Sequence, residues 1–309
     1  MVNIFDLHAD LALTLRKYKQ PGQQAHFRNV SLPDWQKGGV GWTAVASFFE
    51  GDEDWDYMQE TVRMARQDIE ESGLKQILTK EDLCEDDPCT TLLMTIEGMC
   101  GIRKDPVQSI DWLYDMGNRI GSLCWNDENA LATGNSGDPG RGLTEMGRAV
   151  IKEMNRLNMI VDISHANEHT FWDILDASEQ PIIATHSNAK KLCFVERNLT
   201  NQQIKALAAK GGLIGMNACC VFIDEDPAKR TAKRLAEHAA YIADLVGVEH
   251  VACGFDFGAY YEMEDDGTEM WGPLGVPKFI EGLRACGFSE DEVLDIAHRN
   301  VIRFLRQHM

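Results

Sequence analysis

Eight short apolar runs recur along the 309 residues of the chain, and longer amphipathic segments separate them. Most of these runs are apolar throughout instead of alternating with polar residues, which is typical of parallel strands covered on both faces. The runs are VNIFDLHAD (2–10), GWTAVASFFE (41–50), TTLLMTIEG (90–98), RIGSLCW (119–125), MIVDISH (159–165), PIIATHS (181–187), GGLIGMN (211–217) and HVACGFDF (250–257).

Helix signals lie between the runs. Thr200 and Gln203 form a capping box, and Gly211 and Gly212 end the helix that it opens. A second box at Ser289 precedes a final helix with the apolar face Val293, Ile296, Ala297, Val301 and Leu305. Parallel strands need crossover helices, so eight strand-then-helix units predict an α/β fold, a (β/α)₈ TIM barrel. No linker or repeat divides residues 1–309, which predicts a single domain.

The composition indicates which partners the protein is not expected to bind and in which cellular compartment it is expected. The net charge of -19 at pH 7 repels nucleic acid and anionic membrane surfaces, so neither is expected as a partner. No signal segment opens the chain and no apolar run reaches the roughly 20 residues of a membrane span. The nine cysteines lack disulfide-framework spacing, which indicates free thiols in a reducing compartment. We expect a soluble, cytoplasmic protein.

Ionisable side chains lie at the carboxyl ends of five of the apolar runs, where a barrel brings all strand ends to one rim. They are His8, Asp10, Glu97, His165, His186 and Asp256. His8 and Asp10 are two residues apart, so in a regular strand they leave the same face. Asp162, three residues before His165, has the wrong spacing for this and is left out. Two loops, 126–141 and 257–277, leave the same rim and are longer than a barrel needs.

Each of these residues also has an ordinary interpretation: a hydrogen-bonded core histidine, a helix cap or a turn residue. Three imidazoles and three carboxylates gathered at one rim, however, are costly to bury without a counter-charge. A divalent metal supplies that charge, and nitrogen with oxygen ligands suits zinc. Five ligands besides Asp256 are too many for one tetrahedral ion with an open position, which favours two metals and a bridging carboxylate.

The chain resembles the membrane (renal) dipeptidase family of metallopeptidases, a branch of the amidohydrolase superfamily, almost from end to end. The motifs that carry the resemblance are HAD, EG, CWNDENALATG, GLTEMGRAVIKEMNRLNMIVDISH, PIIATHSNAKKLC, RNLTNQQI and GFDF. The resemblance implies two zinc ions, one held by His8 and Asp10 and the other by His165 and His186. It also implies that Glu97 bridges the two ions and belongs to the catalytic site.

The resemblance assigns further roles around the metals. Arg197 matches the residue that holds the carboxylate of the substrate, and Asn198 beside it is also expected to bind substrate. Asp256 matches the catalytic acid. Trp125 stands where mammalian members have a histidine that helps to bind the scissile group, and its indole can donate one hydrogen bond. The family's DFDG appears here as DFGA, so Asp256 is retained but the second acid is absent.

The resemblance implies a zinc-dependent dipeptidase that cleaves short substrates with a free C-terminal carboxylate by attack of a metal-bridging hydroxide. It also allows a homodimer. One alternative is another binuclear amidohydrolase that opens β-lactams or lactones or removes amines, because a fold constrains the substrate weakly. Arg197 speaks against a neutral substrate. A second alternative is a non-catalytic, metal-stabilised barrel, but such a site has no need of Asp256.

Overall fold

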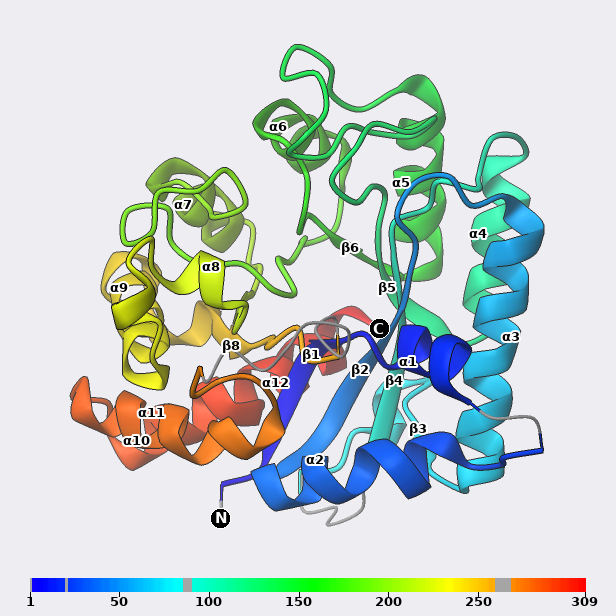
Figure 1. Ribbon diagram of the computed structural model, residues 1–309. Helices are drawn as coiled ribbons and strands as arrows, with labels where there is room; N and C mark the ends of the chain where they lie inside the picture. The colour runs from blue at the N-terminus through cyan, green and yellow to red at the C-terminus, as the bar shows by residue number, and fades with distance from the viewer. Residues whose placement is uncertain (1, 20–21, 86–90, 259–267) are drawn as a thin grey trace.

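Parallel strands form a curled sheet at the centre of the computed structural model, which describes residues 2–19, 22–85, 91–258 and 268–309 (Figure 1). Seven strands follow one another in the order β6, β5, β4, β2, β1, β8, β7, and all neighbours are parallel. Their bounds are β1 Ile4–Ala9, β2 Val40–Phe48, β4 Thr91–Glu97, β5 Asn118–Ser122, β6 Ile160–Asp162, β7 Ile214–Met216 and β8 Val251–Cys253. The predicted parallel α/β sheet is confirmed.

Residues 182–187, most of the sixth predicted strand (181–187), lie between β6 and β7. Ile183 forms a parallel bridge with Asp162 of β6, and Ala184 forms one with Ile214 of β7. The Ile183 N–H donates to the carbonyl of Val161 at 3.0 Å, and the Ala184 N–H donates to that of Leu213 at 2.9 Å. The segment makes isolated bridges instead of a continuous ladder, but it connects the two ends of the sheet. The architecture is therefore TIM-barrel-like, as the sequence predicts.

One strand was missed. The two residues of β3, Lys75–Gln76, pair with the start of β4 outside the main path of the sheet. Two polar residues form no apolar pattern from which a strand could be predicted. Of the second long loop predicted from the sequence, 257–277, residues 259–267 lie outside the described part of the chain.

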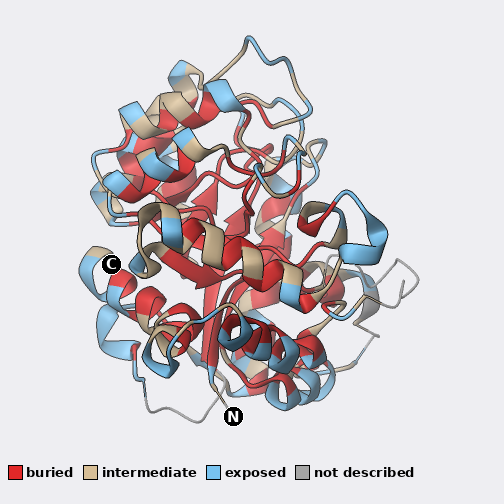
Figure 2. Ribbon diagram, turned by 90° about the vertical axis from the view of Figure 1, so that its left-hand side faces the viewer, coloured by how far each residue is buried: buried red, intermediate tan, exposed pale blue. Residues whose placement is uncertain are grey.

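Helices surround the sheet, with α3 and α4 along one side and α9, α10 and α11 along another (Figure 1). Their inner faces and the strands are buried, whereas their outer faces are exposed (Figure 2). No described helix is both long enough and apolar enough to cross a membrane. The helices are α1 Leu11–Tyr18, α2 Leu32–Gly38, α3 Trp55–Ser72, α4 Pro106–Asp115, α5 Glu145–Leu157, α6 Glu168–Ala177, α7 Asn201–Ala209, α8 Cys220–Ile223, α9 Ala232–Val246, α10 Val276–Ala285, α11 Glu290–Leu294 and α12 Asn300–His308.

Both predicted capping boxes are present. The Thr200 hydroxyl accepts from the Gln203 N–H at the start of α7, and Ser289 caps α11 in the same way. The final helix is not regular throughout, because a π-helical turn at Asp295–Arg299 joins α11 to α12. Such a turn accommodates one extra residue without ending the helix. The apolar face predicted for this helix is fully buried.

Two glycines allow neighbouring backbone to lie very close to the carbonyl oxygen of Thr185. A Cβ added at Gly215 would lie 1.9 Å from the carbonyl oxygen of Thr185, and one added at Gly254 would lie 1.7 Å from it. No side chain fits these distances, so strands β7 and β8 can pack against residue 185 only through glycine. This contact fixes the chain immediately before His186.

We predict that Gly254→Ala lowers the free energy of unfolding by about 3 kcal/mol, at the upper end of overpacking penalties, because backbone must move away from the new methyl group. Gly41→Ala is the control, since its Cβ would lie 3.8 Å from the nearest atom. Chemical denaturation of both variants measures the difference. Equal stabilities would show that the close approach at Thr185 does not constrain the barrel.

Candidate metal centre

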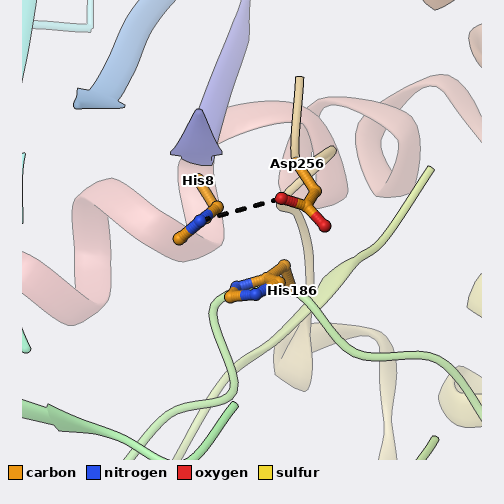
Figure 3. Close-up of side chains that lie close together, drawn as sticks. All are labelled: His8, His186 and Asp256. Carbon is orange, nitrogen blue, oxygen red and sulfur yellow. Dashed lines mark ion pairs between the residues drawn. The ribbon is translucent and has the colours of Figure 1, made fainter. Parts of the chain in front are cut away.

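The six ionisable residues predicted at the strand ends meet in one cluster. Three overlapping trios have ligand atoms within 4.8 Å of one another: His8, His186 and Asp256; Glu97, His165 and His186; His8, Asp10 and Glu97. All six residues are buried, with at most 8% of any of them exposed. Figure 3 shows His8 at the end of β1, with Asp256 and His186 facing it from separate segments. Residues far apart in the sequence thus share one site.

The first strand reaches the cluster by a less regular path than expected. Between Asp6 and Ala9 the pairing advances three residues on β1, whereas the partner residues on β2, Thr43 and Val45, are two apart. This shift is an irregularity in the register of β1 against β2. Asp10 follows the strand, and its N–H donates to the carbonyl of Phe257 at 2.9 Å. The regular alternation assumed from the sequence therefore does not hold, although both His8 and Asp10 reach the cluster.

Glu97, the last residue of β4, lies between two groups of donors. Its Oε2 is 3.0 Å from His8 Nε2, which is itself 3.5 Å from Asp10 Oδ1. Its Oε1 is 2.8 Å from His165 Nε2 and 3.5 Å from His186 Nε2. Each carboxylate oxygen thus faces a different set of ligand atoms. This is the arrangement that a carboxylate shared by two cations requires.

Hydrogen bonds fix the tautomers of two of the histidines. His165 Nδ1 lies 2.8 Å from Asn126 Oδ1, which can only accept, so Nδ1 carries the proton. His186 Nδ1 lies 2.7 Å from Thr185 Oγ1, whose own hydrogen is donated to Asp162 Oδ2 at 2.5 Å. Both neutral rings therefore present the lone pair of Nε2 to the cluster, and these two Nε2 atoms are 3.0 Å apart.

The pKa values of these groups support the neutral histidines. Burial, followed by the charge of Arg197, lowers the pKa of His165 to about 4. Burial and the neighbouring charges of His8 and Arg197 also hold the pKa of His186 well below its ordinary value. Burial opposes ionisation of Glu97, but the positive charge of His8 outweighs it and keeps the Glu97 pKa well below the usual range. Two lone pairs and a carboxylate oxygen consequently converge with no proton between them.

The pKa values of His8, Asp10 and Asp256, the other three residues of the cluster, are all raised. Burial opposes protonation of His8, but Glu97 and Asp10 outweigh it and hold the His8 pKa well above its ordinary value. Burial and the charge of Glu97 raise the pKa of Asp10 to about 8, and Asp10 Oδ1 is buried without a hydrogen-bond partner. Burial raises the pKa of Asp256 to about 6. This set of buried nitrogen and oxygen donors fits divalent metal ions such as zinc.

Two cluster residues have strained backbones. His165 has a φ of 71° and Asp256 a φ of 65°, in the left-handed region that non-glycine residues seldom occupy. Such conformations cost on the order of 1–3 kcal/mol each and persist where the surrounding structure enforces them. Their location at the cluster indicates that the fold holds these side chains for function.

Arg197 is a buried cation beside the cluster. Its Nη1 donates to Ser187 Oγ at 3.0 Å and its Nη2 to the carbonyl of His186 at 3.1 Å, whereas Nε is buried without a hydrogen-bond partner. Burial lowers the pKa of Arg197, although the charge of Asp256 opposes this. Arg197, His165 and Asn198 line one cavity of about 680 Å³. The guanidinium is thus available to an anion entering that cavity.

The remaining two predicted site residues lie outside the ligand cluster. The Asn198 side-chain amide donates to the carbonyls of Cys193 at 3.0 Å and Phe222 at 2.9 Å, so its hydrogens hold the loop together. The half-buried Trp125 ring lies beside His165, with centroids 5.9 Å apart, and meets Phe48 edge to face. Trp125 therefore borders the site, and Asn198 lines the cavity next to it.

Several polar residues that hold the cluster were missed by sequence reasoning. Asp162 bonds to Thr185, and through it orients His186, although its spacing from His165 argued against a role. Asn126 orients His165, and Asn217 donates to Asp256 Oδ2 at 3.1 Å. Thr185 could have been noticed as the hydroxyl beside His186 in the run ATHS. Asp162 ends β6, whereas Asn126 and Asn217 lie outside the helices and strands, and the contacts of all three with distant segments follow only from the fold.

The family model described as membrane dipeptidase (peptidase family M19) matches residues 1–309. The chain belongs to the membrane dipeptidase family. It is a hydrolase of the metallo-dipeptidase class, and the resemblance inferred from the motifs is confirmed.

Individual relatives agree with this. An uncharacterized protein in the pqqA 5′ region of Klebsiella pneumoniae is 33% identical over 244 residues, 75% of this chain and 88% of the relative. An uncharacterized dipeptidase of Schizosaccharomyces pombe is 33% identical over 220 residues, 68% of this chain but 51% of that protein.

Solved structures share the fold. A metallopeptidase from Rhodobacter sphaeroides, liganded with a phosphinate mimic of the dipeptide L-Ala-D-Ala, has a TM-score of 0.85 at 24% identity and covers 100% of this chain and 99% of its own. The metallopeptidase called dipeptidase AC, of family M19, has a TM-score of 0.85 at 25% identity and covers 99% and 98% of the two chains.

We predict that zinc stabilises the metal-free protein strongly, because a cation removes the repulsion among the buried donors. At a free zinc concentration about 1,000 times the dissociation constant, each site adds about 4 kcal/mol to the free energy of unfolding. Glu97→Gln should abolish most of the zinc-dependent rise in Tm, whereas His169→Ala, an exposed histidine outside the cluster, should not. Thermal unfolding with and without zinc measures this, and an unchanged wild-type Tm would contradict it.

Proposed function

We propose that the chain is a zinc-dependent dipeptidase that hydrolyses short substrates with a free C-terminal carboxylate. The observation that carries the proposal is the position of Glu97, whose two oxygens face separate sets of donors, His8 with Asp10 and His165 with His186. Membership of the membrane dipeptidase family supports it. The two zinc ions and the catalytic route below belong to this proposal.

The donors divide between two ions. His8 and Asp10 would hold one, His165 and His186 the other, and Glu97 would share its two oxygens between them. When bound, the zinc ions would lower the pKa of a coordinated water molecule and polarise the scissile carbonyl. The nucleophile is then solvent, so no serine or cysteine of the chain is required to attack.

Asp256 serves as the proton carrier. Its Oδ1 lies 3.8 Å from His8 Nε2 and so faces the cluster, whereas its Oδ2 accepts from the Asn217 amide. One oxygen is thereby fixed and the other is turned towards the reacting atoms. This arrangement suits a carboxylate that takes the proton of the attacking water and delivers it to the leaving amine.

Arg197 selects the substrate by its charge. Its hydrogen bonds go to neutral partners, Ser187 and the His186 carbonyl, and its Nε is without one. A guanidinium in this state binds a carboxylate strongly because water does not compete. The adjoining cavity, about 680 Å³, has the size of a small-molecule site. Asn198 lines this cavity, and the Trp125 indole beside His165 would donate to the developing oxyanion.

The dipeptide mimic bound by the Rhodobacter sphaeroides metallopeptidase supports a dipeptide substrate. We further propose a cytoplasmic location, because the nine cysteines of the sequence lack the spacing of a disulfide framework. The homodimer that the family resemblance allows stays a prediction.

The test compares dipeptides with their C-terminal amides. The zinc-loaded protein should cleave dipeptides, lose activity on chelation and regain it with zinc. Arg197→Ala should lower kcat/KM for free dipeptides by about 10²- to 10³-fold, as expected for loss of a buried charge-assisted contact, and lower it for the amides much less.

The amide serves as the control within each variant, because damage to the fold would lower both activities together. Equal losses on dipeptide and amide would remove the carboxylate-binding role of Arg197. A protein that binds two zinc ions but cleaves no dipeptide would contradict the proposed substrate and favour another binuclear amidohydrolase reaction.

A further inference from the structure

Thr185 and Asp162 form a buried hydrogen-bonded chain behind His186. Asp162 ends β6, and Thr185 lies in the segment 182–187 that connects β6 to β7. Their exposed fractions are 4% and 1%, and that of His186 is 0%, so water does not compete for these bonds. We propose that Thr185 and Asp162 are positioning residues that set the tautomer of His186 and thereby the affinity of one of the two cation sites. The inference rests on the two-cation function proposed above.

Which atom donates and which accepts in each of these hydrogen bonds follows from the hydrogens that each group carries. The Asp162 carboxylate only accepts: its Oδ1 receives the Ser164 N–H at 2.9 Å and the Thr185 N–H at 3.0 Å. Its Oδ2 receives the Thr185 hydroxyl at 2.5 Å. The single hydroxyl hydrogen of Thr185 is used there, because the other neighbouring oxygen, Ser164 Oγ, is farther away at 3.3 Å.

Thr185 Oγ1 is consequently left as an acceptor for His186. The Nδ1 atom of the ring lies 2.7 Å from it and must carry the proton. The lone pair then resides on Nε2, the atom that faces Glu97 Oε1 and His165 Nε2. Partners of this kind behind a metal-binding histidine orient the ring and strengthen it as a ligand.

His165 has a different partner. Its Nδ1 donates to Asn126, a residue of the loop after β5, and not to a carboxylate-linked hydroxyl. His8 and Asp10 take no part in the Asp162–Thr185 chain. Substitutions at residues 162 and 185 should therefore weaken the site of His165 and His186 and leave the site of His8 and Asp10 nearly unchanged.

Substitutions at residues 185 and 162 can change the hydrogen-bond donors and acceptors while the shape of the side chain stays nearly the same. Thr185→Val keeps the shape but removes the acceptor for His186, whereas Thr185→Ser keeps it. Asp162→Asn retains an oxygen for the two backbone N–H groups but presents an amide that donates to Thr185. The hydroxyl hydrogen of Thr185 is then free to point at His186 Nδ1, which moves the ring proton to Nε2 and removes the lone pair from the cluster.

The experiment measures both zinc dissociation constants by competition with a chromophoric chelator. Thr185→Val and Asp162→Asn should weaken one site by about 10- to 100-fold, the usual effect of losing such a partner, and leave the other unchanged. Thr185→Ser should bind both ions like the wild type. Thr43→Val is the matched control, since this buried threonine hydroxyl has no hydrogen-bond partner.

Outcomes distinguish the inference from the function that it rests on. Wild-type affinity at both sites in Asp162→Asn, failure of Thr185→Ser to bind like the wild type, or an equal loss in Thr43→Val would overturn the inference. A wild-type protein that binds fewer than two zinc ions would instead refute the two-cation function. If Thr185→Val does not fold, which the Tm of the metal-free protein reveals, Asp162→Asn and Thr185→Ser decide the matter.

Discussion

The carboxylate of Glu97 is the interaction on which the site depends. Its two oxygens face different sets of imidazole and carboxylate groups in a place where water is nearly excluded. Such a cluster opposes folding unless positive charge balances it, because buried like charges and unshared lone pairs are unfavourable. A bound metal would supply that balance, and a metallo-dipeptidase uses its metal for the chemistry. Folding and function would then depend on one electrostatic requirement.

The fold holds the backbone in defined positions next to residues of the cluster. Glycines at positions 215 and 254 let two strands approach the Thr185 carbonyl, which fixes the chain before His186. Left-handed conformations at His165 and Asp256 aim those side chains from strand ends that regular geometry would direct elsewhere. The register of β1 against β2 is also irregular between Asp6 and Ala9, on either side of His8. Two of the five described non-glycine residues with positive φ, His165 and Asp256, thus lie at the rim, where binding can compensate for their strain.

The sequence predicted the main strands and the six clustered residues for the same reason. Buried parallel strands must be apolar, so ionisable residues at their ends, such as Glu97 and His165, are conspicuous. The conformation of the chain around these residues depends on contacts between distant segments, so it could not be predicted from the local sequence. The register shift in β1, the two-residue β3 and the link from Asp162 through Thr185 are examples. The roles of Arg197 and Asn198 came from family resemblance alone, and only the structure shows that the Asn198 amide bonds to loop carbonyls.

The most direct test of the central claim is anomalous diffraction at the zinc edge from crystals of the zinc-loaded protein. The account predicts two anomalous peaks, one beside each oxygen of Glu97, with His8 and Asp10 at the first and His165 and His186 at the second. A single peak, or two peaks that do not share Glu97, would contradict it.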